Sequence, residues 1–254
     1  ASLTTGAITV NAAANAASTI NGTVSDATAI FSNSSISGLA DATVNLDAAG
    51  TAAAADLKTI ADSFTGGGTG DLDIANIARI TGSITDINAV LSDGEINNKG
   101  TQNVTVTDLT VAATELSTLI TDVAGNSNLT TGNVDIISSS IAGTAAQVAA
   151  VIDTAANGGE AALFTASGTD GVVSGLAAIN VTLDNLATAG TQSTAVADIE
   201  SIAGMTTGVV TATVTETGAS AIAAALTETI DASTGFAGHN LTMTIADTEI
   251  SASD

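Results

Sequence analysis

The chain has 254 residues, of which 45% are hydrophobic but only 2% aromatic, and it contains no cysteine, proline, tryptophan or tyrosine. Its formal net charge at pH 7 is −23, from 26 acidic and three basic side chains. This balance excludes nucleic acid and anionic membrane surfaces as natural partners, since both are bound through clustered lysine and arginine. No stretch approaches the length of an apolar membrane span, so no membrane insertion is expected.

One phrase recurs along the chain: hydrophobic residues, a small residue, and then an acid or amide. Its copies are Phe31-Ser32-Asn33, Ile60-Ala61-Asp62, Leu91-Ser92-Asp93, Ile120-Thr121-Asp122 and the shorter Ile152-Asp153. The hydrophobic positions of successive copies are nearly evenly spaced. This spacing predicts coils of about 30 residues, which is within the range of solenoid repeats.

The coils alternate between two kinds, so the larger repeat holds about 60 residues. One kind opens with a turn that ends in glycine, at residues 4–6, 68–70, 130–132 and 206–208. The other opens with a strand-like phrase rich in Val and Thr, at residues 42–47, 103–108, 180–184 and 240–243. Within it Val104, Val106 and Leu109 alternate with threonines, as in a pleated strand.

Short helices are predicted where apolar residues fall at positions i, i+3 and i+4. Such triplets are Ile87, Val90 and Leu91, then Leu116, Leu119 and Ile120, then Val148, Val151 and Ile152. Capping side chains are expected near their beginnings, at Thr85-Asp86, Thr114-Glu115 and Thr144. Helices this short need packing against neighbouring coils to be stable.

Together these elements predict an α/β solenoid of parallel strands and short helices, forming a single domain over residues 1–254. A long interval between two glycine turns predicts an insertion in the repeat array at Gly159 to Ser174. The alternative is a right-handed all-β helix, which the many Thr, Gly and Asn turns favour. Neither end of the chain has a recognisable cap, so we expect either a fragment or a subunit that polymerises head to tail.

The acids of the recurring phrase are the candidate metal ligands. Equivalent residues of successive coils stack about 4.8 Å apart, so the acids at the helix ends could form a row alternating with acids at strand ends. Ca²⁺, which takes six to eight oxygen ligands in flexible geometry, suits such a row. The alternative is that each acid is simply solvated. The candidate ligands are Asp62, Asp93, Asp122 and Asp153 at the helix ends, and Asp47, Asp108 and Asp184 at the strand ends.

Catalytic groupings are almost absent, and no enzyme is expected. His239 is the only histidine, and there is no cysteine nucleophile. The paired carboxylates Asp71 and Asp73 could serve glycoside hydrolysis, but the aromatic platforms usual in sugar-cleaving clefts are missing.

Six Asn-X-Ser/Thr sequons occur, at Asn21, Asn33, Asn103, Asn128, Asn180 and Asn240. Three of them begin the repeated strand phrase. That repetition favours an origin in the repeat over a role in glycosylation.

The run from Ala197 to Leu226 resembles the recurring phrase of very long secreted surface repeat proteins of cyanobacteria and related marine bacteria. In these a helix ends in a Thr-Thr-Gly turn that is followed by a Val/Thr strand. The resemblance implies a bacterial extracellular or cell-surface protein of adhesin or surface-layer type. We therefore expect a structural subunit of a filament, sheath or surface layer, whose partner is another copy or flanking repeats. The alternative is an adhesin segment that binds surface polysaccharide or another cell.

Overall fold

A computed structural model describes the middle of the chain and parts of its ends. The described residues are 8–9, 18–47, 50–64, 69–99, 102–125, 133–152, 173–176, 178–183, 199, 201–216 and 240–245. The chain divides into two compact units. The first holds Ala1–Asp108, Thr118–Asp135 and Phe164–Val172, and the second holds Leu109–Ser117, Ile136–Leu163 and Val173–Asp254. The single-domain expectation stays a prediction.

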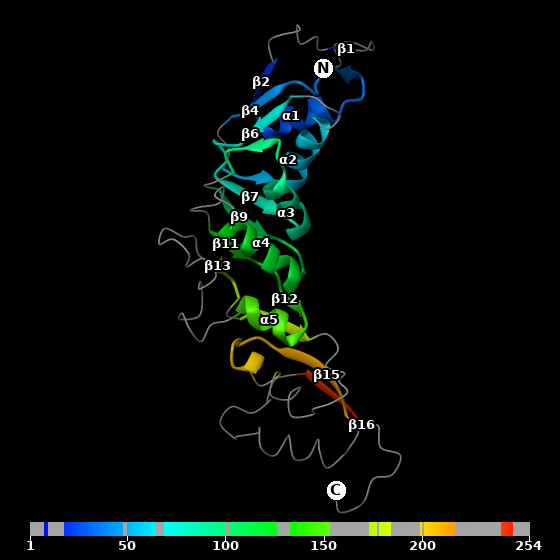
Figure 1. Cartoon of the computed structure of the whole chain (residues 1–254), viewed down its shortest axis with the longest axis vertical. Helices are drawn as coiled ribbons and strands as arrows, with labels where there is room; N and C mark the ends of the chain where they lie inside the picture. The colour runs from blue at the N-terminus through cyan, green and yellow to red at the C-terminus, as the bar shows by residue number, and fades with distance from the viewer. Residues whose placement is uncertain are drawn as a thin grey trace, which may run out of the picture. The chain divides into compact units, whose positions relative to one another are not determined.

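Short strands and short helices alternate along the chain (Figure 1). The helices in the described part are α1 (Val24–Phe31), α2 (Ala54–Ala61), α3 (Ile84–Ser92), α4 (Ala113–Gly125) and α5 (Ala145–Ile152), and a 3-10 helix η1 (Asp62–Phe64) follows α2. The strands are β1 (Ile8–Thr9), β2 (Thr19–Gly22), β3 (Ile36–Ser37), β4 (Thr43–Leu46), β5 (Ala52–Ala53), β6 (Asp71–Asp73), β7 (Arg79–Gly82), β8 (Ile96–Asn97), β9 (Asn103–Val106), β10 (Thr110–Ala112), β11 (Val134–Ile136), β12 (Ser140–Gly143), β13 (Val173–Ser174), β14 (Asn180–Leu183), β15 (Val210–Glu216) and β16 (Asn240–Ile245).

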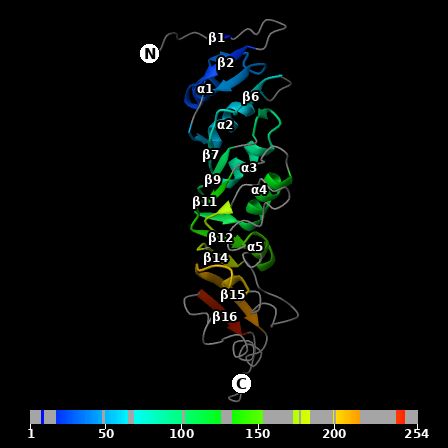
Figure 2. The ribbon, with the colours of Figure 1, turned by 90° about the vertical axis from the view of Figure 1, so that its left-hand side faces the viewer.

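In the first unit, parallel strands form two main sheets. One has the order β2-β4-β6-β8, and the other contains β5, β7 and β9 side by side. Paired residues lie one coil apart in the chain, as for Thr19 with Thr43 and Thr43 with Asp71. Helices α1, α2 and α3 follow one another beside these strands (Figure 2). Because each connection between paired strands contains a helix, the unit is built from strand, helix and parallel strand.

In the second unit, five parallel strands have the order β10-β12-β14-β15-β16. Thr110 pairs with Ser140, and Thr211 pairs with Asn240, so each of these pairs joins neighbouring coils. The interval from Ser140 to its partner Asn180 is longer than either of these. The predicted insertion falls in this longer interval, but apart from Val173 and Ser174, which form β13, it lies outside the described residues.

The buried faces of the helices agree with the predicted triplets, apart from Ile120, whose side chain lies outside the described residues. Ile87, Val90 and Leu91 of α3 are buried, as are Leu116 and Leu119 of α4 and Val148, Val151 and Ile152 of α5. The mixed α/β class is therefore correct, and the all-β alternative is wrong. One strand prediction was also wrong: Leu109 is 78% exposed, because β9 ends at Val106 and β10 begins only at Thr110.

The helix caps were predicted only in part. Thr144 accepts a hydrogen bond from the Gln147 amide, and Gln147 Oε1 accepts one from the Thr144 amide, which is a complete capping box. For α3, however, the N-cap is Ser83, whose hydroxyl accepts from the Asp86 amide at 3.1 Å. Thr85 lies inside the helix instead, since an N-cap needs extended backbone that only Ser83 adopts.

The glycine of the repeated turn is needed because two coils approach closely there. A Cβ on Gly208 would lie 2.1 Å from the Ile179 carbonyl oxygen, and one on Gly70 would lie 2.5 Å from the Ala40 oxygen. Thr206 stabilises the same turn with two hydrogen bonds. Its buried hydroxyl donates to Ile179 O at 2.7 Å and accepts from the Gly208 amide at 2.9 Å. The Thr-Thr-Gly turn at residues 206–208 is thus a close contact with the chain around Ile179.

The asparagine that begins the strand phrase has a similar structural role. Asn103 Oδ1 accepts from the Asn133 amide at 3.0 Å, and Asn180 Oδ1 accepts from the Val209 amide at 2.9 Å. Each bond joins one coil to the coil that follows it in the chain. This supports the interpretation that these asparagines recur because the repeat needs them.

Candidate functional site: the acidic helix ends

The acid or amide of the recurring phrase forms the turn that leaves two of the helices, α1 and α3. Asp93 Oδ1 accepts from the Glu95 amide at 2.9 Å, and Asn33 Oδ1 accepts from the Ser35 amide at the same distance. The two residues follow α3 and α1, and each turn leads into a two-residue strand. A side-chain oxygen two residues before the amide is the geometry of an Asx turn. Because asparagine serves as well as aspartate, this turn requires the oxygen rather than the charge.

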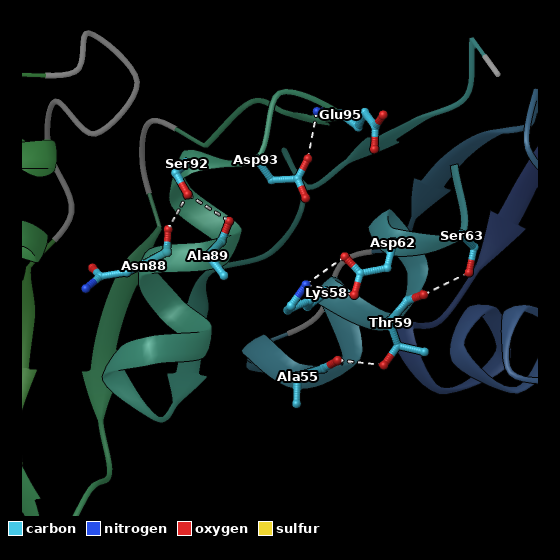
Figure 3. Close-up of polar contacts among 10 residues, drawn as sticks. All are labelled: Ala55, Lys58, Thr59, Asp62, Ser63, Asn88, Ala89, Ser92, Asp93 and Glu95. Atoms are coloured by element: carbon cyan, nitrogen blue, oxygen red, sulfur yellow. Dashed lines mark hydrogen bonds and ion pairs between the residues drawn. The ribbon is translucent and has the colours of Figure 1, made fainter. Parts of the chain in front are cut away.

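Hydroxyl groups near the ends of α2 and α3 donate to main-chain carbonyls of the last helical turn (Figure 3). Ser92 Oγ donates to the carbonyls of Asn88 and Ala89, at 2.8 and 3.2 Å. Ser63 Oγ donates to Thr59 O at 2.9 Å. Serine side chains commonly make such bonds to carbonyls three or four residues earlier. They explain why small polar residues stand near the end of the phrase.

Asp62 forms an ion pair. Lys58 Nζ donates to both Asp62 oxygens at 2.7 Å, one helical turn away (Figure 3). This hydrogen bond is the main reason why the pKa of Lys58 lies above its ordinary value; desolvation opposes it, and the charges of Asp62, Asp93 and Asp86 add to it. A carboxylate at the C-terminus of a helix is unfavourable with respect to the helix dipole, and Lys58 offsets that charge.

Lys99 and Gln102 form a buried polar cluster that the sequence did not indicate. Gln102 is fully buried, and its Nε2 donates to Ile74 O at 2.9 Å and Asn98 O at 3.0 Å. Lys99 is also buried, and its Nζ donates to the main-chain carbonyl of Asp93. Burial lowers the pKa of Lys99, against the attraction of Asp93. A lone glutamine and lysine among Gly and Asn residues carry no periodic signal that could have revealed this cluster.

The third cation, Arg79, is also engaged within the protein. It lies on β7, and its Nη1 donates to the hydroxyl of Thr105 on the neighbouring β9. With Lys58 paired and Lys99 buried, each of the three basic side chains of the chain has an internal partner.

The strand-end acids have different surroundings. Asp108 Oδ2 accepts from the Ile84 amide at 2.6 Å, so it caps the first turn of α3 from a segment far away in the chain. Asp47 is exposed, and its amide donates to Gly22 O at 2.8 Å. The side chain of Asp122 within α4, and Asp153 and Asp184 altogether, lie outside what the structure describes.

Asp71 and Asp73 share the outer face of the β2-β4-β6-β8 sheet with asparagines. Asp71 Oδ2 accepts from Asn97 Nδ2 at 3.0 Å, and Asp73 Oδ1 accepts from Asn98 Nδ2 and from the Ala75 amide. The pair is therefore committed to contacts with neighbouring strands and turns. This arrangement gives no support to a catalytic role.

The described residues contain no group of three or more acids or histidines that could hold a metal ion. Asp62 is paired with Lys58, Asp93 forms a turn, and Asp108 caps a helix. Each has a structural role that needs no cation. Since the other acids of the proposed row are not described, the calcium row as a whole stays a prediction.

Two substitutions of Asp93 separate its oxygen from its charge. Asp93→Ala removes the Asx-turn bond and is expected to lower the free energy of unfolding by about 1 kcal/mol. Asp93→Asn keeps the bond and relieves the charge at the helix C-terminus, so stability should be unchanged or raised by about 0.3 kcal/mol. Urea denaturation measures both. If the asparagine variant were as unstable as the alanine variant, charge rather than the turn would explain this residue.

The two lysines should titrate on opposite sides of 10.5, their ordinary pKa. Because the pKa of Lys58 is raised, its stabilising contribution is present below pH 10.5 and is lost as pH rises through its folded pKa. Because the pKa of Lys99 is lowered, stability rises with pH between its folded pKa and 10.5. NMR titration of the Cε resonances checks this, and Lys58→Arg assigns the two signals. Titration of Lys99 after Lys58 would contradict the burial of its amine.

The chain matches no family model, no curated protein and no solved structure. In the part of the chain that the structure describes, no helix is both long and apolar enough to cross a membrane. Function must therefore be argued from the architecture and from the internal use of the polar side chains.

Proposed function

We propose that this protein is an extracellular structural protein, a subunit or segment of a filament, sheath or surface layer, whose parallel strands and helices repeat as the coils of a solenoid. The observation that carries the proposal is the regular parallel pairing of strands, which reaches β16, a six-residue strand with β15 as its one neighbour among the described residues. The resemblance of Ala197 to Leu226 to secreted surface repeat proteins supports the location.

The backbone of β16 offers hydrogen bonds on the side away from β15. In the described strands, residues at buried positions donate their amides to the following strand, as Leu72 does to Glu95 O and Val181 to Val209 O. Residues at the alternate positions donate to the preceding strand, as Asn180 does to Ser139 O. By register, Leu241 and Met243 of β16 correspond to the first kind. Their amides face the side on which β16 has no neighbour among the described residues, which makes β16 a template for pairing.

The partner that fits is β2 of a second copy. β2 is the first strand of its sheet and pairs with β4 alone among the described residues. Since the Thr43 amide donates back to Ser18 O, the corresponding amides of Thr19 and Asn21 face away from β4. Parallel pairing of β16 with β2 would satisfy both edges and propagate head to tail, because the two surfaces differ.

Charge sets the conditions for such assembly. Copies that each carry a net charge of −23 repel one another, and each has only three basic side chains against 26 acids. At 0.1 M salt the Debye length is about 10 Å, so salt screens much of this repulsion. Assembly should therefore strengthen with ionic strength.

Electron microscopy and sedimentation of the purified chain in about 0.5 M NaCl, where exposed charges are strongly screened, test the proposal. Regular fibres or sheets are expected. Met243→Pro removes an amide on the open side of β16 and should abolish them, whereas Met243→Ala removes the side chain, keeps the amide and should retain them. Circular dichroism identifies a variant that has not folded. Persistent monomers of the natural chain, or fibres of a folded Met243→Pro variant, would overturn the proposal; monomers that bind polysaccharide would favour an adhesin.

A further inference from the structure

The sequons differ sharply in their surroundings, and one of them meets the requirements of a glycan acceptor. Transfer of a glycan needs an accessible side-chain amide nitrogen, a hydroxyl two residues later, and a backbone that can enter the active site of a transferase. Sequons that are modified therefore lie in surface loops of secreted proteins. Within the described residues, the side chains of Asn21, Asn33, Asn103 and Asn180 can be compared.

The three sequons on strands fail these requirements. Thr105, the hydroxyl residue of the Asn103 sequon, is buried and accepts a hydrogen bond from Arg79. Asn180 and Val181 donate their amides to strands on either side, so this sequon is held in the middle of a sheet.

In the Asn21 sequon, the side chains of both the asparagine and the threonine are already engaged in hydrogen bonds. Asn21 Oδ1 accepts from Asn45 Nδ2 at 3.2 Å. The Thr23 hydroxyl caps α1, since it accepts from the Asp26 amide and donates to the Asp26 carboxylate.

The Asn33 sequon, in contrast, lies in an exposed turn. Asn33, Ser34 and Ser35 are all exposed in the turn between α1 and β3, and their main chain makes only local bonds, from the Asn33 amide to Ile30 O and from the Ile36 amide to Asn33 O. Asn33 Oδ1 accepts from the Ser35 amide. This bond fixes the side chain through its oxygen and leaves Nδ2 without a partner among the described residues.

We propose that Asn33 is an N-glycosylation site of this protein. Nδ2 forms a bond to the anomeric carbon of a lipid-linked oligosaccharide, whose bond to the pyrophosphate oxygen breaks. The lipid pyrophosphate leaves with the electron pair, and one Nδ2 proton passes to a base of the transferase. Oδ1 remains a carbonyl oxygen, so the Asx turn at the end of α1 is kept.

Asn33 differs from the residues that hold the same place in the other copies of the recurring phrase. At the equivalent turn after α3 the residue is Asp93, and the phrase after α2 ends in Asp62; neither has a side-chain amide nitrogen. Asn33 is thus the member of these three helix ends that can accept a glycan. A bulky hydrophilic glycan there would mark one turn of the first unit on a face made of helix ends.

The test incubates the folded chain with a purified oligosaccharyltransferase and a lipid-linked oligosaccharide, and measures site occupancy by mass spectrometry of peptides. Occupancy at Asn33 should exceed that at Asn180 by at least about tenfold, since opening a central strand costs more than the free energy that corresponds to a factor of ten. Ser35→Ala should abolish modification of Asn33, and the matched variant Ser34→Ala should leave it unchanged.

The outcomes are distinguishable. Modification lost in Ser35→Ala but kept in Ser34→Ala supports the site, provided that circular dichroism shows both variants folded. An unmodified Asn33 in a reaction that glycosylates a control peptide of the same sequence would overturn the proposal. Equal occupancy at Asn33 and Asn180 would also overturn it, because accessibility would then not govern the reaction.

Discussion

Replacing Gly70 with alanine is expected to lower the free energy of unfolding by about 2–3 kcal/mol, the cost of forcing extra volume into a packed region. A Cβ at this position would lie 2.5 Å from Ala40 O, 2.6 Å from Phe64 Cδ1 and 2.8 Å from Ala42 O. Two of these atoms are backbone atoms of the preceding coil, so the clash cannot be relieved by a change of rotamer. The Gly70 amide also donates to Ala40 O at 3.0 Å, and any shift would strain that bond.

Gly94→Ala is the matched control in the same unit. Nothing lies within 4 Å of a Cβ built on Gly94. This substitution should be neutral or slightly stabilising, because alanine reduces the freedom of the unfolded chain. Denaturant melts of both variants measure the difference. Equal stabilities for the two would show that the coils do not approach closely at the glycine turn.

Phe64→Ala should be the most damaging single change in the core, with a loss of about 3–5 kcal/mol. Phe64 is 1% exposed at the end of η1, and its ring contacts Phe31 edge to face, with centroids 5.4 Å apart. Truncation removes a large buried surface and leaves a cavity between α1 and η1. Thermal and urea unfolding measure the effect.

The exposed residue Leu109 provides the control for Phe64. Leu109→Ala should change stability by less than about 0.5 kcal/mol, as for other surface sites. Since Gly70 faces the Phe64 ring, the cost of Gly70→Ala should be smaller in the Phe64→Ala background. Simple additivity of the two changes would contradict the contact between them.

Much of this architecture could be predicted from spacing alone. The aliphatic triplets found three helices, because a buried helical stripe recurs with a fixed period in the sequence. The recurring phrase located the ends of α1, α2 and α3, but for α4 it was wrong: Asp122 lies inside this helix, which continues to Gly125. Where two residues fit the same sequence pattern, the pattern could not show which of them has the predicted role. Ser83 and Thr85 both suit a helix cap, and the backbone conformation that selects Ser83 depends on the strand before it.

The acids show most clearly what the sequence could not predict. Asp62, Asp93 and Asp108 looked alike as members of a repeating row, yet one pairs with a lysine, one forms a turn and one caps a neighbouring helix. The partner of Asp108 belongs to a different coil, whereas those of Asp62 and Asp93 are close in the chain. No local pattern distinguishes these roles. The buried pair Lys99 and Gln102 was missed for the same reason, since its partners are carbonyl oxygens.

Amide hydrogen exchange at increasing protein concentration, at the same high ionic strength, tests the central proposal most directly, because it reads the edges of the strands one residue at a time. The proposal predicts that Leu241 and Met243 of β16 and Thr19 and Asn21 of β2 become protected as copies associate. Thr242, which by register donates to β15, should be protected already in the dilute chain. If the exchange rates of the amides of Leu241, Met243, Thr19 and Asn21 did not change with protein concentration, assembly through β16 and β2 would be contradicted.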